Sequence, residues 1–224
     1  MGCVILNVGT DIIVVNDNIE AEETALAADG PYHHGNLRAA LLERAETILT
    51  ASGAEALTLR GLARELGVSH AAPARHFRDR QALLDALAVS GFTTLNARLR
   101  SAAGEGGGPV GARLAELGRT YVDFAVGHTA LLELMFAVKH ADDSSDELRE
   151  LGHESLLIVA RLMAEGQEAG AVRAGEPGQL AQVAFSTVHG LATLAVASLL
   201  DETPLAEATE LALEILLAGL RPGG

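Results

Sequence analysis

The stretch TLRGLARELGVSHAAPARHF, residues 58–77, predicts two short helices joined by a tight turn. Leucine and alanine recur at helical spacing through its first half, where Thr58 is suited to cap a helix that ends at Leu66. Gly67 stands where a helix end takes the left-handed conformation that glycine adopts without a steric penalty. This pattern is typical of a helix-turn-helix unit, which places its second helix in the DNA major groove.

The second helix of this unit is expected to begin after Ser69, which is suited to cap it. Pro73 falls early enough in the helix that its missing N–H costs little, and Phe77 closes the small core. Side chains that are small or basic remain outward, where they let the backbone approach DNA and leave donors free for bases or phosphates. These outward residues are His70, Ala71, Ala74 and Arg75.

The flanking sequence separates DNA recognition from the alternative, which is ordinary packing of two helices in a helical protein. Upstream, apolar periodicity predicts a helix over about 36–51, and downstream a long helix over roughly 81–103. The three helices around the turn make a compact head, which favours DNA binding.

From about residue 31 onward the chain resembles the TetR/AcrR family of one-component transcriptional repressors. The resemblance is carried by YHHGNLRAALL, LARELGVSHAAPARHF and DRQALLDAL. Farther on, HTALLELMF and FSTVHGLATL are similar to the C-terminal domain type named for a Trp-His-Gly signature, although Thr187-Val188-His189-Gly190 lacks the tryptophan. The resemblance implies an all-α fold, with a three-helix DNA-binding domain followed by a helical ligand-binding and dimerisation domain.

Matched position by position, the resemblance implies that Arg60 faces the groove, that His70 and Ala71 lead the recognition helix, and that His76 and Arg80 hold phosphates. Family members usually carry a tyrosine where this chain has Ala74. The expected DNA-contacting set is Thr58, Arg60, Ser69, His70, Ala71, Ala74, Arg75, His76 and Arg80. The alternative for the histidines and Arg60 is that they are only exposed helix residues.

A net charge of −14 argues at first against a nucleic-acid partner, because phosphates repel an acidic protein. The charge is unevenly distributed, however. Residues 31–100 hold nine arginines and six acidic groups, a balance of +3, while the rest of the chain carries −17. The positive charge therefore lies with the helix-turn-helix, and we expect DNA affinity to fall steeply with salt.

Composition and the lack of catalytic motifs argue against several other classes of protein. With 49% hydrophobic residues, the chain can bury a sizeable core. Its single cysteine, Cys3, leaves no intramolecular disulfide or cysteine metal pair, which agrees with a reducing cytoplasm. The sequence has no glycine-rich phosphate loop and no serine in a nucleophile elbow, so an enzyme is disfavoured, and we expect no cofactor or metal.

Residues 1–30 do not follow the pattern of the rest. CVILNV and DIIVVN are β-branched runs around Gly9-Thr10 and fit a hairpin, and EAEETALAAD fits an acidic linker or a weak helix. The segment is either an N-terminal extension or an over-extended translation start, and it lacks the pattern of a secretory signal. We divide the remainder into a DNA-binding domain, 31–82, and an effector-binding and dimerisation domain, 83–224.

Proline and glycine divide the second domain into further predicted helices. Their expected ranges are 110–126, 130–140, 146–168, 178–200 and 205–220. The uncharged span 177–200 is long enough to suggest a membrane helix, but polar residues interrupt it, so a buried helix is the better interpretation. The last helix is amphipathic, and the last two helices either complete the monomer core or form a four-helix dimer interface, which we favour.

The middle helices offer candidates for an effector cavity that would suit a small hydrophobic or amphipathic molecule, although methionine and phenylalanine at helical spacing more often fill a core. The candidates are Phe124, His128, Leu132, Met135, Phe136, His140, His153, Leu157, Met163 and His189. The histidine spacings match no compact metal motif. The resemblance implies that effector binding shifts a homodimer away from its DNA-competent form, which relieves repression at a palindromic operator. An architectural DNA-binding protein without an effector is the remaining alternative.

Overall fold

The computed structural model describes residues 7–8, 11–12, 37–104, 107–141 and 144–223. In the N-terminal unit, Met1–Gly35, the described residues form a small antiparallel pair, β1 (Asn7–Val8) and β2 (Asp11–Ile12), in which Asn7 pairs with Ile12 and Val8 with Asp11. This agrees with the expected hairpin, although its turn and the acidic segment that follows lie outside the described residues.

The second unit, Asn36–Gly224, is helical throughout its described part, as expected. Its α-helices are α1 (Leu37–Ser52), α2 (Leu59–Glu65), α3 (Arg80–Ala103), α4 (Val110–Gly127), α5 (Thr129–Lys139), α6 (Asp146–Glu168), α7 (Pro177–Val196) and α8 (Leu205–Leu220). Two short 3-10 helices, η2 (Ala54–Ala56) and η3 (Pro73–Arg75), flank α2. The bounds of α6 and α8 are those that the sequence predicted.

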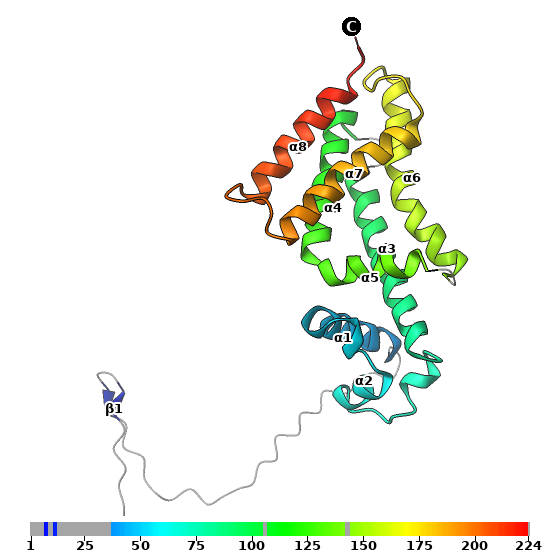
Figure 1. Cartoon of the computed structure of the whole chain (residues 1–224), viewed down its shortest axis with the longest axis vertical. Helices are drawn as coiled ribbons and strands as arrows, with labels where there is room; N and C mark the ends of the chain where they lie inside the picture. The colour runs from blue at the N-terminus through cyan, green and yellow to red at the C-terminus, as the bar shows by residue number, and fades with distance from the viewer. Residues whose placement is uncertain (1–6, 9–10, 13–36, 105–106, 142–143, 224) are drawn as a thin grey trace, which may run out of the picture. The chain divides into compact units, whose positions relative to one another are not determined.

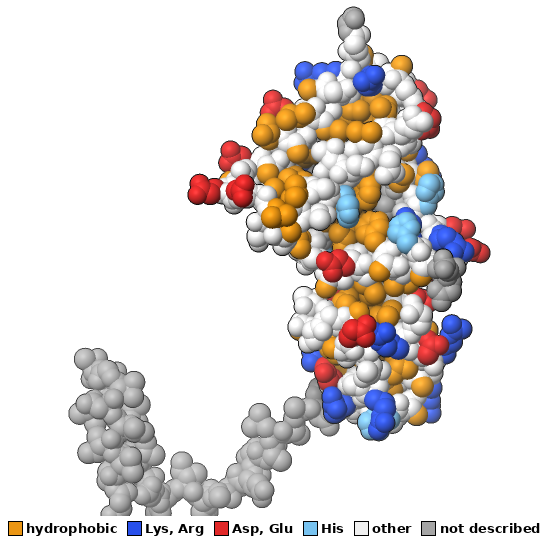
Figure 2. All heavy atoms as spheres, viewed as in Figure 1, with side chains coloured by type: hydrophobic (Ala, Val, Ile, Leu, Met, Phe, Trp, Pro, Cys, Tyr) orange, Lys and Arg blue, Asp and Glu red, His pale blue; other side chains and the backbone are white. Residues whose placement is uncertain are grey.

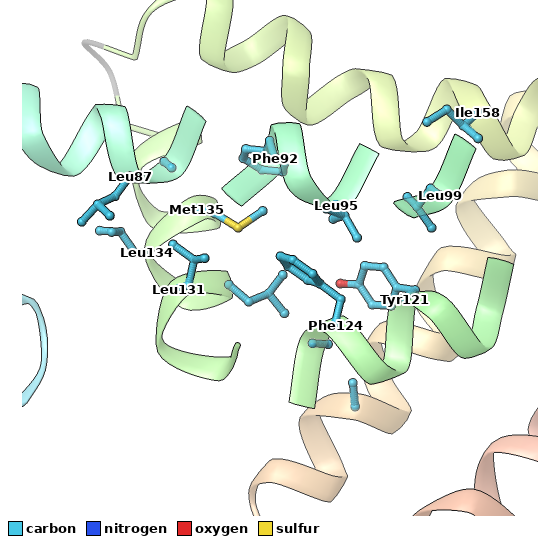
Figure 3. Packing of buried hydrophobic residues seen from close by; sticks show 14 of the residues in the cluster. Leu87, Phe92, Leu95, Leu99, Tyr121, Phe124, Leu131, Leu134, Met135 and Ile158 are labelled. Atoms are coloured by element: carbon cyan, nitrogen blue, oxygen red, sulfur yellow. The ribbon is translucent and has the colours of Figure 1, made fainter. Parts of the chain in front are cut away.

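Helix α3 is the axis of this unit. In Figure 1 it runs from the end that carries α1 and α2 into the bundle of α4 to α8. Its side chains Leu87, Phe92, Leu95 and Leu99 are almost fully buried. They face residues of α4, α5 and α6, which Figure 3 shows around them. One continuous helix therefore joins the bundle to the end that carries α1 and α2.

Helix α7 departs from the prediction in two ways. It ends at Val196 instead of residue 200, because the chain turns at Ser198, whose φ is 57°. It is also not a buried helix, since Val183 is 60% exposed and Leu194 is 44% exposed. Among the described residues, no single helix is both long and apolar enough to cross a membrane, and only α4 and α5 taken together, bent by 99°, meet both conditions.

Candidate nucleic-acid interface and effector cavity

The first half of the helix-turn-helix forms as the sequence predicted. Thr58 caps α2, with its hydroxyl oxygen accepting a hydrogen bond from the Gly61 N–H at 3.0 Å. The helix ends at the Leu66 cap, and Gly67 follows with a φ of +64°. The Val68 N–H then donates to the carbonyl of Ala63 at 3.0 Å. The glycine thus lets the chain fold back onto α2 and enter the second half.

The second half is helical only over a short distance. The prediction of an α-helix after Ser69 is wrong, because the segment forms a turn and a short 3-10 helix instead. The Ser69 carbonyl, and not its side chain, closes the first turn by accepting from the Ala72 N–H at 2.9 Å. A 3-10 helix follows over Pro73–Arg75, and the Pro73 carbonyl accepts from the N–H groups of His76 and Phe77. Because Pro73 has no N–H of its own, it starts a turn but cannot extend one from residue 69.

The exposed side chains of this segment are the ones expected to meet DNA. Pro73 and Phe77 are buried, Val68 and Ala72 are partly buried, and the other side chains of residues 69–76 are exposed. The exposed members of the expected set are Thr58, Arg60, Ser69, His70, Ala71, Ala74, Arg75 and His76. Figure 2 shows basic side chains at this end of the molecule. The segment therefore offers a protruding surface with little steric bulk and several donors.

Arg80 is placed differently from the rest of the set. Its Nη2 donates to the carbonyl of Ala54 at 2.7 Å and its Nε donates to the carbonyl of Leu57 at 3.1 Å. Glu55 lies 3.5 Å away. The guanidinium is thus bound to the carbonyls of the η2 turn, and it fixes the start of α3 against the loop before α2. A phosphate-binding role for Arg80 is not what this geometry favours.

Further arginines, which were not in the expected DNA-contacting set, lie around this turn. The Arg38 guanidinium lies 5.5 Å from the centroid of the Phe77 ring, which brings the first turn of α1 next to the recognition segment. Arg64 is exposed at the end of α2. Among the described residues, Arg64, Arg60 and Arg75 form no ion pair, whereas Arg44 is paired with Glu65. These unpaired charges are available for phosphates.

The body contains a group of hollows around the aromatic side chains of α4, α5 and α7. One cavity of about 390 Å³ is lined by Leu132, Glu133, Phe136 and His189 together with smaller residues of α4, α5 and α7 and with Ala197 after α7. A second, of about 200 Å³, shares Phe136 and adds His140 and His153. Five of the expected effector residues thus lie in the walls of neighbouring cavities.

Four other candidates are placed elsewhere. Phe124 and Met135 are fully buried core residues, which Figure 3 shows packed beneath α3. Leu157 is 37% exposed, and its neighbour Leu156 lines the cavities instead, because adjacent helical residues point about 100° apart. His128 lies at the corner between α4 and α5, outside the cavity walls. These four residues do not line the cavities in this structure.

Met163 contributes to a third hollow of about 60 Å³ that is almost wholly apolar. The same hollow is bounded by Tyr121 and Phe185, which also line the second cavity. Sequence reasoning missed both of these aromatic residues. For Phe185, the sequence signal was its spacing of four residues from His189, which places both rings on one side of the helix. The two rings stack with their centroids 5.2 Å apart.

The polar centre of the cavities is a hydrogen bond between Tyr121 and His189, 2.8 Å from the hydroxyl oxygen to Nδ1. Burial raises the pKa of Tyr121 and lowers the pKa of His189, so both groups are neutral at neutral pH. Among the described residues, no three His, Cys, Asp or Glu side chains lie close enough together to hold a metal ion. The cavity walls are thus largely aromatic and apolar, with a few neutral and basic groups and, in the larger cavity, the carboxylate of Glu133.

An exposed apolar face lies on the last two helices. Its members are large hydrophobic residues that a water-soluble surface seldom gathers in one place. They are Val183 and Leu194 on α7, Leu199 after it, and Leu211 and Ile215 on α8, all 44% to 64% exposed. Figure 2 shows hydrophobic side chains over this part of the bundle.

Comparison with known proteins identifies the class. Residues 41–87 match the family described as bacterial regulatory proteins, tetR family, and residues 114–220 match the tetracyclin repressor-like C-terminal domain. The chain belongs to the TetR family of transcriptional regulators. No curated protein matches it.

Solved structures agree with this assignment. A protein of unknown function from Rhodococcus sp. RHA1 is 48% identical, with a TM-score of 0.80 over 86% of this chain and 99% of that one. The TetR family transcriptional regulator PfmR from Thermus thermophilus is 18% identical, with a TM-score of 0.65 over 81% and 98% of the two chains. The fatty acid degradation regulator FadR from Bacillus halodurans is also 18% identical, with a TM-score of 0.66 over 82% and 100%. The last two likenesses concern the fold alone.

Proposed function

We propose that this TetR-family regulator is a homodimeric repressor that binds a palindromic operator and leaves it when a small molecule occupies the body. The observation that carries the DNA-binding part is the turn after Gly67, with His70, Arg75 and Arg60 exposed and Arg60 in no ion pair among the described residues. These side chains contact bases and phosphates, whereas Arg80 holds the turn in place from within. No catalytic step is assigned to the chain.

The dimer in this proposal forms through the exposed apolar faces of α7 and α8. Val183, Leu199, Leu211 and Ile215 are each more than half exposed in a single chain. Pairing two copies by a two-fold axis buries these side chains in a four-helix interface and duplicates the recognition segment. Two recognition segments about 34 Å apart then read half-sites one helical turn apart.

The effector part rests on the cavities around Phe136 and on the continuity of α3. The wall residues of α5 and α7 are joined to the head by α3 and by the contact of α5 with α1. A ligand that fits the cavities best when the two heads are wrongly spaced lowers the fraction of dimer able to bind DNA. Reciprocity requires that DNA weakens effector binding by the same factor.

Footprinting on DNA upstream of the regulator's own gene tests the DNA-binding proposal. We expect protection of an inverted repeat whose half-site centres are about one helical turn apart. Protection of a single half-site would contradict the dimer, and protection without sequence preference would favour an architectural protein. A reporter under this promoter that rises when the regulator is deleted would support repression, and one that falls would indicate activation.

A further inference from the structure

We propose that the effector is a small aromatic carboxylate, and that Lys139 binds its carboxylate in the second cavity. This rests on the proposed function and names the ligand class of that site. Lys139 is the chain's single lysine among sixteen basic residues, and it ends α5 inside the wall of the 200 Å³ cavity. Among the described residues that line this cavity, no other is a lysine or an arginine.

The position of Lys139 is built by its neighbours. Its ammonium nitrogen lies 5.9 Å from the Phe92 ring centroid and 6.0 Å from the Phe136 centroid. Its stem lies over Gly152 of α6, where a methyl group would approach Cδ to 2.5 Å and Cε to 2.7 Å. Glycine at position 152 therefore leaves room for the lysine stem, and the charged end lies over the two rings at cation–π distance.

The positive charge of Lys139 is not paired with Glu154, the acidic residue of α6 that stands between the lining residues His153 and Ser155 in the sequence. Glu154 is bound to Arg100, 2.5 Å from Nη2 to Oε1, and its other oxygen accepts from Asn96. Among the described residues, Lys139 forms no ion pair. Burial lowers the pKa of Lys139, so an anion that enters the cavity strengthens the protonated form that it binds.

The rest of the cavity fits a ring. Phe92 and Phe136 meet edge to face with centroids 6.0 Å apart, and Tyr121 and Phe185 do so at 5.5 Å. Such walls offer both ring faces and ring edges, the arrangement that aromatic partners prefer. A volume of about 200 Å³ is below the 300 Å³ or so at which drug-sized sites begin, which indicates a compact ligand.

Lys139 binds the carboxylate, and the ring lies in the cavity against Phe136 and Phe185, whose ring centroids are 6.2 Å apart. His140 and His153 stand at the rim of the same cavity and are exposed, so they are placed to donate to the second carboxylate oxygen. A neutral ligand of the same shape gains the ring contacts but leaves Lys139 without an anion.

The test compares matched acid and amide pairs on the full-length protein. Binding of benzoate, phenylacetate and cinnamate, each beside its primary amide, is measured by titration calorimetry, and release of operator DNA is followed by fluorescence anisotropy. We expect at least one acid to bind about tenfold more tightly than its amide and to release DNA. Equal binding of acid and amide, or no acid with a Kd below about 1 mM, would overturn the inference. In that case the free protein would still bind the operator, so a failure of this ligand assignment can be distinguished from a failure of the proposed DNA-binding function.

Substitutions of residues that line the second cavity make the test more specific. Lys139→Met is expected to bring the acid and its amide within about twofold of each other, and Lys139→Arg to keep the preference for the acid. Gly152→Ala keeps the lysine but displaces its stem, and because alanine favours a helix it tests the site even if Lys139→Met does not fold. Arg161→Gln removes an exposed charge from α6 outside the cavity and should change neither affinity. Wild-type acid binding in both Lys139→Met and Gly152→Ala would contradict the assignment.

Discussion

His128 joins the body to the DNA-binding head, with its Nδ1 3.0 Å from Oε1 of Glu46 on α1. The imidazole also stacks on Phe124, whose ring centroid is 4.8 Å away and which is fully buried in the body. The contact lies at the corner where α4 turns into α5, and α5 supplies walls of both larger cavities. This corner is therefore a second connection between the cavity walls and α1, in addition to α3.

We expect His128→Ala to weaken the coupling between effector and DNA more than it weakens the fold. Both side chains are about one-third exposed, so their loss should lower the free energy of unfolding by less than about 1 kcal/mol. Coupling between the two sites should change by about 0.5–2 kcal/mol. Titrating DNA with and without a releasing ligand measures the coupling. Glu43→Gln, an exposed change on the same helix, is the control, and equal coupling in both variants would contradict this role.

Replacing Arg60 and His70 together by alanine should abolish specific operator binding. Each good base contact contributes about 1–3 kcal/mol of discrimination, so the double variant is expected to lose about a hundredfold or more in affinity. Both side chains are exposed, and the thermal midpoint and dimer mass should remain those of the wild type. Anisotropy titration with operator and scrambled DNA makes the measurement. Retained discrimination would place the base contacts elsewhere on the head.

Arg75→Ala should reduce the salt dependence of DNA binding. Each phosphate contact contributes about −0.9 to the slope of log affinity against log salt concentration, so removing one should flatten the slope by about 1. Arg75 is exposed beside the turn and, within the described part of the chain, has no carboxylate partner. Arg161→Ala on α6 changes the net charge equally and should leave the slope as it is. A flat salt dependence in the wild type would contradict the phosphate contacts altogether.

The sequence predicted helix limits best where a local signal sets them. Helix α6 begins after Ser145, whose hydroxyl oxygen accepts from the Leu148 N–H, and α8 begins after Pro204. The segment after Gly67 was predicted less well, because its 3-10 geometry depends on how Pro73 and Phe77 pack into the head and not on spacing. Propensity favours a helical turn there but does not fix its type.

The cavity could be predicted only in part, since its walls come from several helices whose relative rotation no local pattern records. Phe136 and His189 were expected, whereas Tyr121 and Lys139 were not, although Tyr121 is the hydrogen-bond partner of His189. For the same reason the sequence did not indicate that Leu156, and not Leu157, lines the cavities. Helical spacing tells which residues share a face but not which face meets a hollow.

The dimer predicted from the apolar face is open to a direct test. Leu199→Glu and Ile215→Glu each place a charge on a side chain that is more than 60% exposed in one chain, so the monomer should keep its fold. In the dimer the same charge would be buried, which costs far more than any contact it can form there. Ultracentrifugation should give half the wild-type mass. Leu157→Glu on α6 is the matched control and should remain dimeric, and an unchanged mass in all three variants would exclude this interface.

Acid should weaken the attachment of α8 through the Arg119–Glu210 pair. The guanidinium on α4 donates to both carboxylate oxygens of Glu210, at 2.6 and 2.7 Å, and this bidentate contact lowers the pKa of Glu210 in the folded protein. A carboxyl whose folded pKa is lowered stabilises the fold above its unfolded pKa of about 4.3, and that contribution is lost as the pH falls through the folded value.

Glu210→Gln should therefore lower the thermal midpoint at neutral pH and converge with the wild type as the pH falls below about 4. Glu210 is fully exposed, so the difference is expected to be small and to shrink with added salt. Thermal unfolding at several pH values gives the comparison. Glu214→Gln removes a carboxylate from the same helix that has no ion pair among the described residues, and it should follow the wild type throughout. A constant gap between Glu210→Gln and the wild type from neutral pH into acid would show that the pair does not act through its charge.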